Sequence, residues 1–253
     1  MLALWPREGG VTFVVSERMA VVITLLGDDR QRGANPPPTV AAQAAAALGV
    51  DGVCAGLGTG SSGQVLVWGQ DATSIALEDL QFTLGQGPGM DVDAGAPVLV
   101  SDLEAAAARW PVFVPAAAAL GVRALFALPL RIGAIHVGAL QAYRANPGSL
   151  DGAALSDAFA LAEAVTLLLL HRQAAAADPG GAASGGPQPD WSQPVTFRAQ
   201  VHQATGMISA QLGVTLAEAL VRLRAHAYVE DRLIAEVAAD VVARRLRFEN
   251  DKR

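Results

Sequence analysis

The stretch QATGMISAQLGVTLAEALVRLRAHAYVEDRLIAEVAADVVARRL, residues 203–246, decides the fold of the C-terminal part of the chain. Its apolar residues recur every three or four positions, which predicts amphipathic helices. We expect three of them, over about residues 196–212, from Thr215 onward, and over about residues 232–247. Helices this short are not stable singly in water, so their apolar faces must pack together.

Two local signals support the break between the first and second helices. Gly213 follows the last apolar residue of the first helix and suits a left-handed C-terminal cap. Thr215 and Glu218 then have the T-x-x-E spacing of a capping box, in which each side chain accepts a hydrogen bond from a free backbone N–H of the first turn. The sequence therefore predicts a helical hairpin followed by a third helix.

These residues resemble the ANTAR family over the whole module. The resemblance rests on an Ala-x-Gly pattern, a Glu-Ala-x-x-x-Leu-Arg run and a Leu-x-x-Val-Ala ending, formed by Ala204, Gly206, Glu218, Ala219, Leu223, Arg224, Leu233, Val237 and Ala238. It implies a three-helix domain that binds paired RNA stem-loops in nascent transcripts and prevents premature termination. Unstacked loop bases would offer edges and faces for recognition, and phosphates would meet guanidinium groups.

The residues expected to contact RNA are Thr205, Arg222, Arg224, Arg232, Arg244 and Arg245. Thr205 stands where many members of the family have lysine, and relatives with a preceding GAF domain often have threonine there. Tyr228 is expected at the edge of the core rather than as a platform for stacked bases. The alternative for the arginines of the last helix is a solvated face with favourable dipole contacts.

The preceding part of the chain alternates between strand and helix patterns, which predicts an α+β fold with a mostly antiparallel sheet. Strands are expected at residues 52–57, 65–68, 98–100, 124–130 and 135–143, and helices at 40–48, 74–84, 103–109, 116–120 and 150–176. The segments LEDLQFTLGQGPGMD, GAPVLVSDL, RWPVF, GVRALFALPLRIGAIHVGALQAYR and PGSL, in this order, resemble a GAF domain. That resemblance implies a central antiparallel sheet with helices on both sides, often with a pocket for a small molecule.

Four segments follow from these patterns. Residues 1–37 form an N-terminal segment, 38–177 a GAF-like sensor domain, 178–195 a flexible linker rich in Gly, Pro and Ser, and 196–253 the ANTAR domain. Residues 1–195 hold 9 arginines against 17 acidic residues, whereas residues 196–253 hold 9 basic residues against 7 acidic ones. This asymmetry indicates an interaction surface at the C-terminal end.

The composition of the chain argues against several classes of function. Cys54 is the only cysteine, so the chain can form no intramolecular disulfide and no thiol–disulfide catalytic pair. The apolar run at residues 161–170 contains Glu163 and is too short to cross a bilayer, which predicts a cytoplasmic protein with no membrane contact. No catalytic pair, metal-ligand spacing or phosphate-binding loop is recognisable, so we expect neither an enzyme nor a metal site.

The resulting hypothesis is a signal-responsive RNA-binding regulator that acts by transcription antitermination. The sensor domain would bind a small ligand of unknown identity or mediate association, and no other cofactor is expected. A homodimer is expected because two hairpin loops need two copies of so small a module, with the helix at residues 150–176 as the candidate interface. The alternative is a protein-interaction adaptor or dimerisation scaffold without RNA binding.

Overall fold

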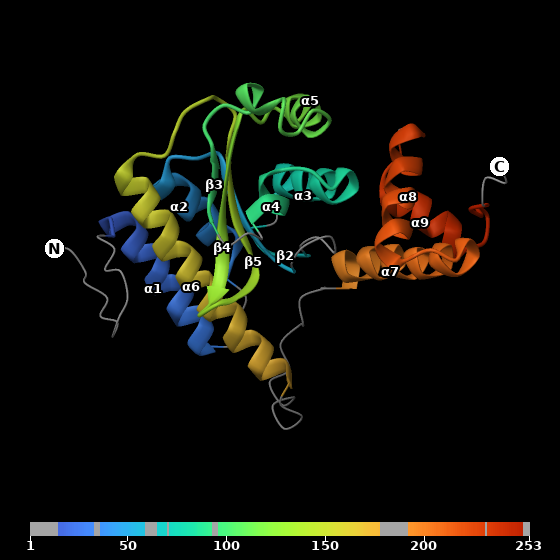
Figure 1. Ribbon diagram of the computed structural model, residues 1–253. Helices are drawn as coiled ribbons and strands as arrows, with labels where there is room; N and C mark the ends of the chain where they lie inside the picture. The colour runs from blue at the N-terminus through green and yellow to red at the C-terminus, as the bar shows by residue number, and fades with distance from the viewer. Residues whose placement is uncertain are drawn as a thin grey trace.

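A computed structural model describes residues 15–32, 36–58, 65–69, 71–92, 96–177, 192–230 and 232–249 (Figure 1). Its centre is a five-stranded sheet in the order β2-β1-β5-β4-β3, with every neighbouring pair antiparallel. The strands are β1 (Gly52–Leu57), β2 (Val65–Trp68), β3 (Val98–Val100), β4 (Ala124–Ile132) and β5 (Ile135–Arg144). We call this sheet and the helices that pack on it, residues 15–177, the sheet domain.

Helices cover both faces of the sheet (Figure 1). One layer consists of α1 (Glu17–Arg32), α2 (Pro38–Leu48) and α6 (Gly152–Ala177); the other consists of α3 (Ala72–Leu84), α4 (Pro88–Asp91) and α5 (Phe113–Ala119). Side chains of β4 alternate between the layers, since Phe126 and Leu128 join the cluster under α6 and Leu125 joins the cluster under α3 and α5. The predicted α+β fold, with an antiparallel sheet between helices, is confirmed.

The N-terminal boundary differs from the prediction. Helix α1 begins at Glu17, well before residue 38, and its buried residues Met19, Val22 and Leu26 belong to the same apolar cluster as α2, α6 and the sheet. Residues 17–32 therefore belong to the sheet domain rather than to a separate segment. Glu17 and Arg18, which are exposed, interrupt the apolar run before Met19 and obscured the pattern of this helix.

Helix α6 spans nearly the range predicted for it, and the apolar run at residues 161–170 forms its middle. Residues 152–172 of this helix are long and apolar enough to cross a membrane by length and composition alone. Its apolar side chains Ala158, Leu161, Val165 and Leu168 are buried against α1 and the sheet, which is how a core helix of a folded domain behaves. The burial of this helix, not its length, explains its composition.

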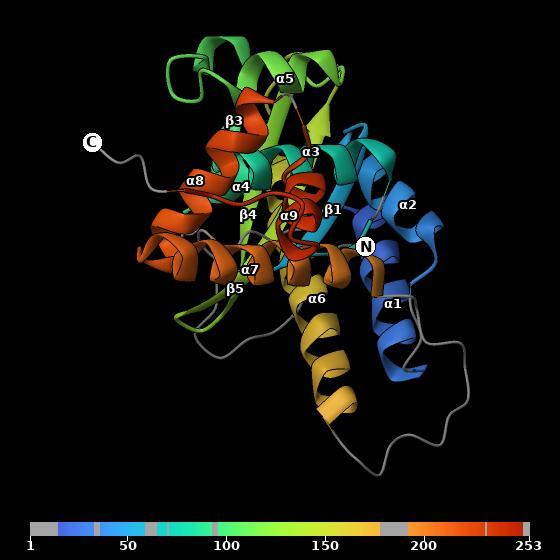
Figure 2. The ribbon, with the colours of Figure 1, turned by 90° about the vertical axis from the view of Figure 1, so that its right-hand side faces the viewer.

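The C-terminal residues form three packed helices, as predicted: α7 (Ser192–Leu212), α8 (Leu216–Val229) and α9 (Ile234–Val242). They are called here the C-terminal module. Their buried stripes meet in one cluster that includes Val201, Ile208, Leu223 and Val237. Figure 2 shows the module lying in front of α3 and α4 when the molecule is viewed from its side.

The ends of these helices agree with the local signals. Gly213 has φ +67°, and the Thr215 hydroxyl accepts a hydrogen bond from the Glu218 N–H at 3.2 Å. Helix α9 is shorter than expected and ends at Val242. The predicted linker overlaps the start of α7 at residues 192–195, and its residues 178–191 lie outside the described part of the chain.

One predicted helix is replaced by shorter turns. Residues 103–109 contain only the 3-10 turn Glu104–Ala106, because Leu103 and Trp110 are both anchored in the cluster under α3 and α5. Cys54 is buried in β1, and burial raises the pKa of its thiol to about 12. This free cysteine therefore behaves as a small apolar core residue.

Gly138 of β5 provides a test of the register between β1 and β5. A Cβ atom there would lie 2.0 Å from the Gly56 carbonyl oxygen, so Gly138→Ala forces two paired strands apart. We expect the free energy of unfolding to fall by about 3 kcal/mol, measured by chemical denaturation. The control Gly152→Ala, where a Cβ meets nothing within 4 Å, should change it by less than about 0.5 kcal/mol; equal effects would contradict the register.

Candidate nucleic-acid interface

The arginines of the C-terminal module lie in different environments. Arg222, on α8, forms an ion pair with Glu218 one turn earlier, with 2.9 Å between Nη2 and Oε1. Its side chain is 40% exposed, so the guanidinium group lies at the surface with N–H groups available beyond the carboxylate. Exposed pairs at this spacing contribute little to stability, about 0.3–0.5 kcal/mol.

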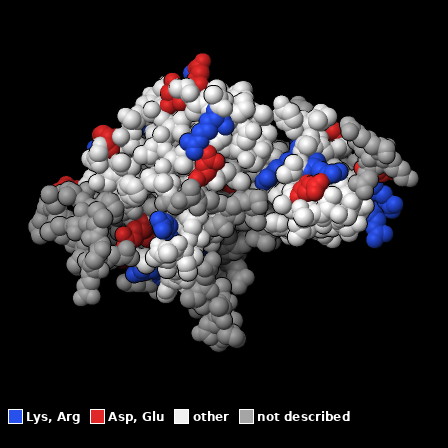
Figure 3. Space-filling view, viewed as in Figure 1, with Lys and Arg blue, Asp and Glu red and all other residues white. Residues whose placement is uncertain are grey.

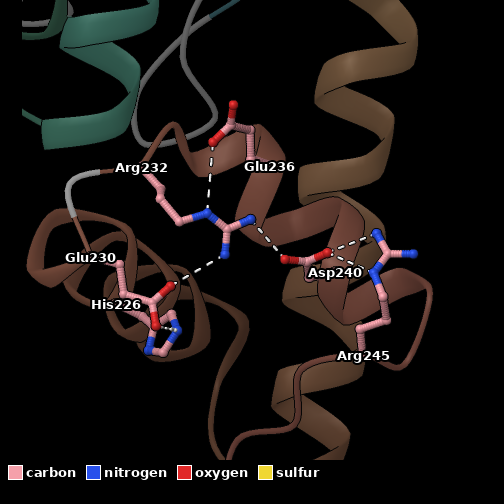
Figure 4. A network of polar contacts seen from close by, with 6 residues as sticks. All are labelled: His226, Glu230, Arg232, Glu236, Asp240 and Arg245. Carbon is pink, nitrogen blue, oxygen red and sulfur yellow. Dashed lines mark hydrogen bonds and ion pairs between the residues drawn. The ribbon is translucent and has the colours of Figure 1, made fainter.

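Arg232 and Arg245 share one acidic partner, Asp240 of α9 (Figure 4). Nη2 of Arg232 lies 2.7 Å from Oδ2 of Asp240, and Nη2 of Arg245 lies 2.7 Å from Oδ1. The hydrogen bonds from the two guanidinium groups lower the pKa of Asp240, and the bond to Asp240 raises the pKa of Arg232. Arg232 also contacts Glu230 and Glu236. The network orients both guanidinium groups at the surface, where Arg245 is 66% exposed.

Arg244 has an unusual backbone conformation. It follows α9 with φ +60° and is the only non-glycine residue of the described chain with positive φ. The Arg244 N–H donates to the Val241 carbonyl, and the Arg245 N–H donates to the Asp240 carbonyl, which together form a Schellman C-terminal cap. Glycine is favoured at this position because an L-residue there is strained by about 1–2 kcal/mol. The exposed Arg244 side chain has no partner among the described residues, so its charge faces solvent.

Two predicted contact residues are engaged elsewhere: Thr205 is buried, and the partly exposed Arg224 contacts the sheet domain. Thr205 is 5% exposed, and its hydroxyl donates to the Val201 carbonyl one turn earlier at 2.7 Å. Arg224 of α8 reaches the sheet domain, where its Nε donates to the Phe82 carbonyl oxygen of α3 at 2.9 Å. Burial lowers the pKa of Arg224. In this arrangement neither side chain is presented to a nucleic acid.

Charge is distributed unevenly over the visible face of the molecule. Figure 3 shows basic side chains gathered on the C-terminal module around acidic ones. This agrees with the network at Asp240, whose carboxylate lies between two guanidinium groups. The predicted arginines are thus at the surface rather than buried, with Arg224 as the exception.

Helix α8 also carries exposed apolar residues. The large ones on or beside it are Leu216, Val221, Tyr228, Val229 and Leu233. Tyr228 is 59% exposed, which corrects the expectation that it lies at the core edge. A phenol ring in this position has a free face, as base stacking would require.

The sheet domain contains a buried polar cluster that the sequence did not indicate. Nε2 of Gln81 donates to Oε1 of Gln141 at 2.8 Å, and the Gly89 N–H donates to Oε1 of Gln81 at 2.7 Å. Nε2 of Gln141 donates to Glu78 at 3.1 Å, and all three side chains belong to residues that are at most 4% exposed. Burying such groups is tolerable only when they are hydrogen-bonded. No periodicity marks this cluster, because it forms between α3 and a strand some sixty residues later.

Residues 193–242 match the model of the ANTAR domain family. The C-terminal module is an ANTAR domain. The match spans nearly the whole of α7, α8 and α9, including the Thr215 cap and the Asp240 carboxylate. RNA binding and antitermination are the activities that this family implies, whereas the ANTAR match does not extend over the sheet domain.

The sheet domain is similar to solved GAF domains at low sequence identity. One comes from an Acinetobacter phosphoenolpyruvate-protein phosphotransferase (15% identity, TM-score 0.46, covering 64% of this chain and 99% of that one). Another comes from the corresponding protein of Coxiella burnetii (17%, TM-score 0.44, covering 64% and 100%). A third is the phycoerythrobilin-bound GAF domain of a cyanobacterial phytochrome (11%, TM-score 0.43, covering 63% and 98%). Among curated proteins, none matches the chain.

The Asp240 network predicts an acid-dependent loss of stability. The folded state lowers the pKa of Asp240 below its ordinary value of 3.8, so its contribution is complete above that pH. The contribution is lost as the pH falls through the folded pKa. We expect wild-type stability to fall more steeply below about pH 4 than that of Asp240→Asn, measured by denaturant unfolding at a series of pH values.

The control for this titration is Glu249→Gln, which removes an exposed carboxylate outside the network. Parallel stability curves for wild type and Asp240→Asn across the acidic range would show that the two arginine contacts do not form in solution.

Proposed function

We propose that this chain is an RNA-binding regulator that acts by transcription antitermination, with the ANTAR domain binding RNA stem-loops and the sheet domain responding to a signal. The observation that carries the proposal is the ANTAR match over a packed three-helix module. The surface arginines Arg222, Arg232, Arg244 and Arg245 are the phosphate contacts in this proposal. Thr205 is not among them, because its buried hydroxyl donates to the Val201 carbonyl within α7.

The ion pairs at Asp240 are compatible with phosphate binding. A guanidinium group has five N–H donors, and the pair to Asp240 engages only some of those of Arg245. Because the carboxylate already holds Arg232 and Arg245 in place, less side-chain entropy is lost when a phosphate binds them. Arg244 adds a cation with no competing partner among the described residues.

Gly206, within the matched range, adds a structural observation. It lies within α7, where glycine is less favourable than alanine by about 0.5–1 kcal/mol. A Cβ atom at this position would meet nothing within 4 Å, so no packing among the described residues requires glycine. In this proposal, an RNA backbone approaches α7 closely at Gly206.

The remaining parts of the proposal follow from the domain arrangement. The sheet domain senses a small ligand or mediates a homodimer, with α6 as the candidate interface, and the protein acts in the cytoplasm on nascent transcripts. The alternative is an adaptor without RNA binding. The exposed apolar residues Val221 and Tyr228 of α8 favour that alternative, since such residues also suit a protein partner.

Replacing Arg244 separates RNA binding from folding. Arg244→Gly relieves the positive φ while removing one cation, so stability should stay equal or rise by about 1 kcal/mol. Affinity for an RNA with two stem-loops, selected from randomised loops against the full chain, should fall about tenfold. The slope of log affinity against log salt should shrink by about 0.7–0.9.

The matched control is Arg123→Ala, which removes an equally charged, exposed arginine paired with Glu104 in the sheet domain. It should leave affinity and salt slope unchanged. Unchanged binding in Arg244→Gly as well, or tight binding without salt dependence, would contradict the proposed phosphate contacts, whereas no RNA binding by the wild type would favour the adaptor.

Gly206→Ala tests the close approach to α7. The substitution should stabilise the helix by about 0.5–1 kcal/mol in thermal unfolding and weaken RNA binding about tenfold. Gly27→Ala is the matched control, because Gly27 also lies within a helix and an added methyl group there would meet nothing within 4 Å. It should stabilise the chain similarly without affecting RNA binding. Full RNA affinity in Gly206→Ala would refute the close approach.

A further inference from the structure

The last turn of α3 connects the sheet domain to the ANTAR domain. Phe82 belongs to α3, yet it is fully buried in the apolar cluster formed by the ANTAR helices, together with Val201, Ala204 and Ile208. The ANTAR core therefore includes an aromatic ring from the other domain. Burial of a phenylalanine side chain favours association, so this ring is an anchor between the domains.

Arg224 of α8 completes the contact from the ANTAR side. Besides the 2.9 Å hydrogen bond to the Phe82 carbonyl, its guanidinium carbon lies 5.5 Å from the centre of the Phe82 ring. Helix α3 ends immediately afterwards at Gly85, in the left-handed conformation. Its last carbonyl groups lack helical partners and carry partial negative charge, so a cation donating to one of them stabilises both the helix end and the interface.

The same turn of α3 also faces the interior of the sheet domain. Gln81, the residue before Phe82, holds the buried amide pair with Gln141 and accepts the Gly89 N–H. Gly87 and Gly89 pack so closely on these amides that a Cβ at either would lie 2.7 Å from them. Gln81 and Phe82 are adjacent residues of one helical turn, so a rearrangement at Gln81 that displaces the backbone of α3 also displaces Phe82.

We propose that the last turn of α3 is an autoinhibitory latch that holds the ANTAR domain against the sheet domain and withholds Arg224 from RNA. The proposal rests on the proposed function. In the latched state, Phe82 and the carboxyl end of α3 occupy Arg224; in the released state, Arg224 becomes a further cation of α8 that RNA can contact. Rearrangement of the Gln81–Gln141 pair is the internal event that releases it.

The latch predicts how the affinity for RNA depends on the fraction of released protein. When only the released state binds RNA fully, the apparent dissociation constant equals the intrinsic one divided by the released fraction. Weakening the anchor therefore tightens RNA binding, although it removes apolar contacts. This direction is opposite to that of an ordinary destabilising substitution.

The first measurement tests, without RNA, whether the ANTAR domain packs against the last turn of α3. Hydrogen exchange followed by mass spectrometry is compared for the full-length wild type, Phe82→Ala and Arg224→Lys. Lysine keeps the charge but lacks the planar guanidinium group and the Nε donor that bonds to Phe82. We expect faster exchange in the last turn of α3 and in α8 for both variants. Unchanged exchange in both would overturn the latch.

The second measurement reads RNA binding with the same two-stem-loop RNA. Phe82→Ala should bind about tenfold more tightly than wild type, and Arg224→Lys severalfold more tightly, because its cation is retained. Phe82→Leu keeps an apolar anchor and should resemble wild type. The control Leu103→Ala removes a buried leucine of the cluster under α3 and α5 that belongs neither to α3 nor to the ANTAR core, and it should not tighten binding.

The outcomes separate the two proposals. Faster exchange with unchanged or weaker RNA binding overturns the latch, while the wild type's binding upholds the RNA-binding regulator. Absence of RNA binding in the wild type and in every variant overturns the proposed function and, with it, the latch as a control on RNA access. Faster exchange with tighter binding in both Phe82→Ala and Arg224→Lys supports the latch.

Discussion

The shared apolar core of α7, α8 and α9 is the interaction on which the C-terminal part of this protein depends. Each helix is short, and much of its buried stripe is alanine, which contributes little surface on burial. No one of them holds its conformation without the others. Phe82, from the other domain, is the largest buried side chain in that core, so the ANTAR domain obtains part of its packing from the sheet domain. Folding of the tail and contact between the domains are therefore linked.

Packing of the core also decides which charges reach the surface. Asp240 lies on the side of α9 that faces away from the apolar cluster. Arg232 precedes the helix and Arg245 follows it, and both donate hydrogen bonds to the Asp240 carboxylate. One carboxylate thereby fixes two guanidinium groups. Arg244 lies in the C-terminal cap, where backbone hydrogen bonds compensate for its strained φ. The basic surface is thus a consequence of how α9 begins and ends.

The sheet domain contributes a second constraint through α3. Its inner side is held by hydrogen bonds among buried side chains, whereas its last turn is held by Phe82 and Arg224. Buried amides tolerate only a few arrangements, because each unpaired group costs about 1–3 kcal/mol. The last turn of α3 is therefore a point of contact between the two domains.

Local chemistry was sufficient to predict much of this protein from its sequence. The spacing of Val201, Ile208 and Leu212, the glycine at 213 and the Thr215 cap determined the C-terminal helices, because helix periodicity and capping act within a few residues. The strands β4 and β5 were likewise marked by their own apolar runs.

What the sequence left undecided depended on distant partners. The sequence alone does not distinguish Arg222 from Arg224. In the folded protein, α3 packs on Arg224 and partly buries it, whereas Arg222 stays at the surface. Thr205 and α1 are further cases, since the threonine hydroxyl is satisfied inside its own helix and α1 is buried by α6. Helix formation is local, but burial is a property of the whole fold, and burial decided which of the predicted residues remain free to bind.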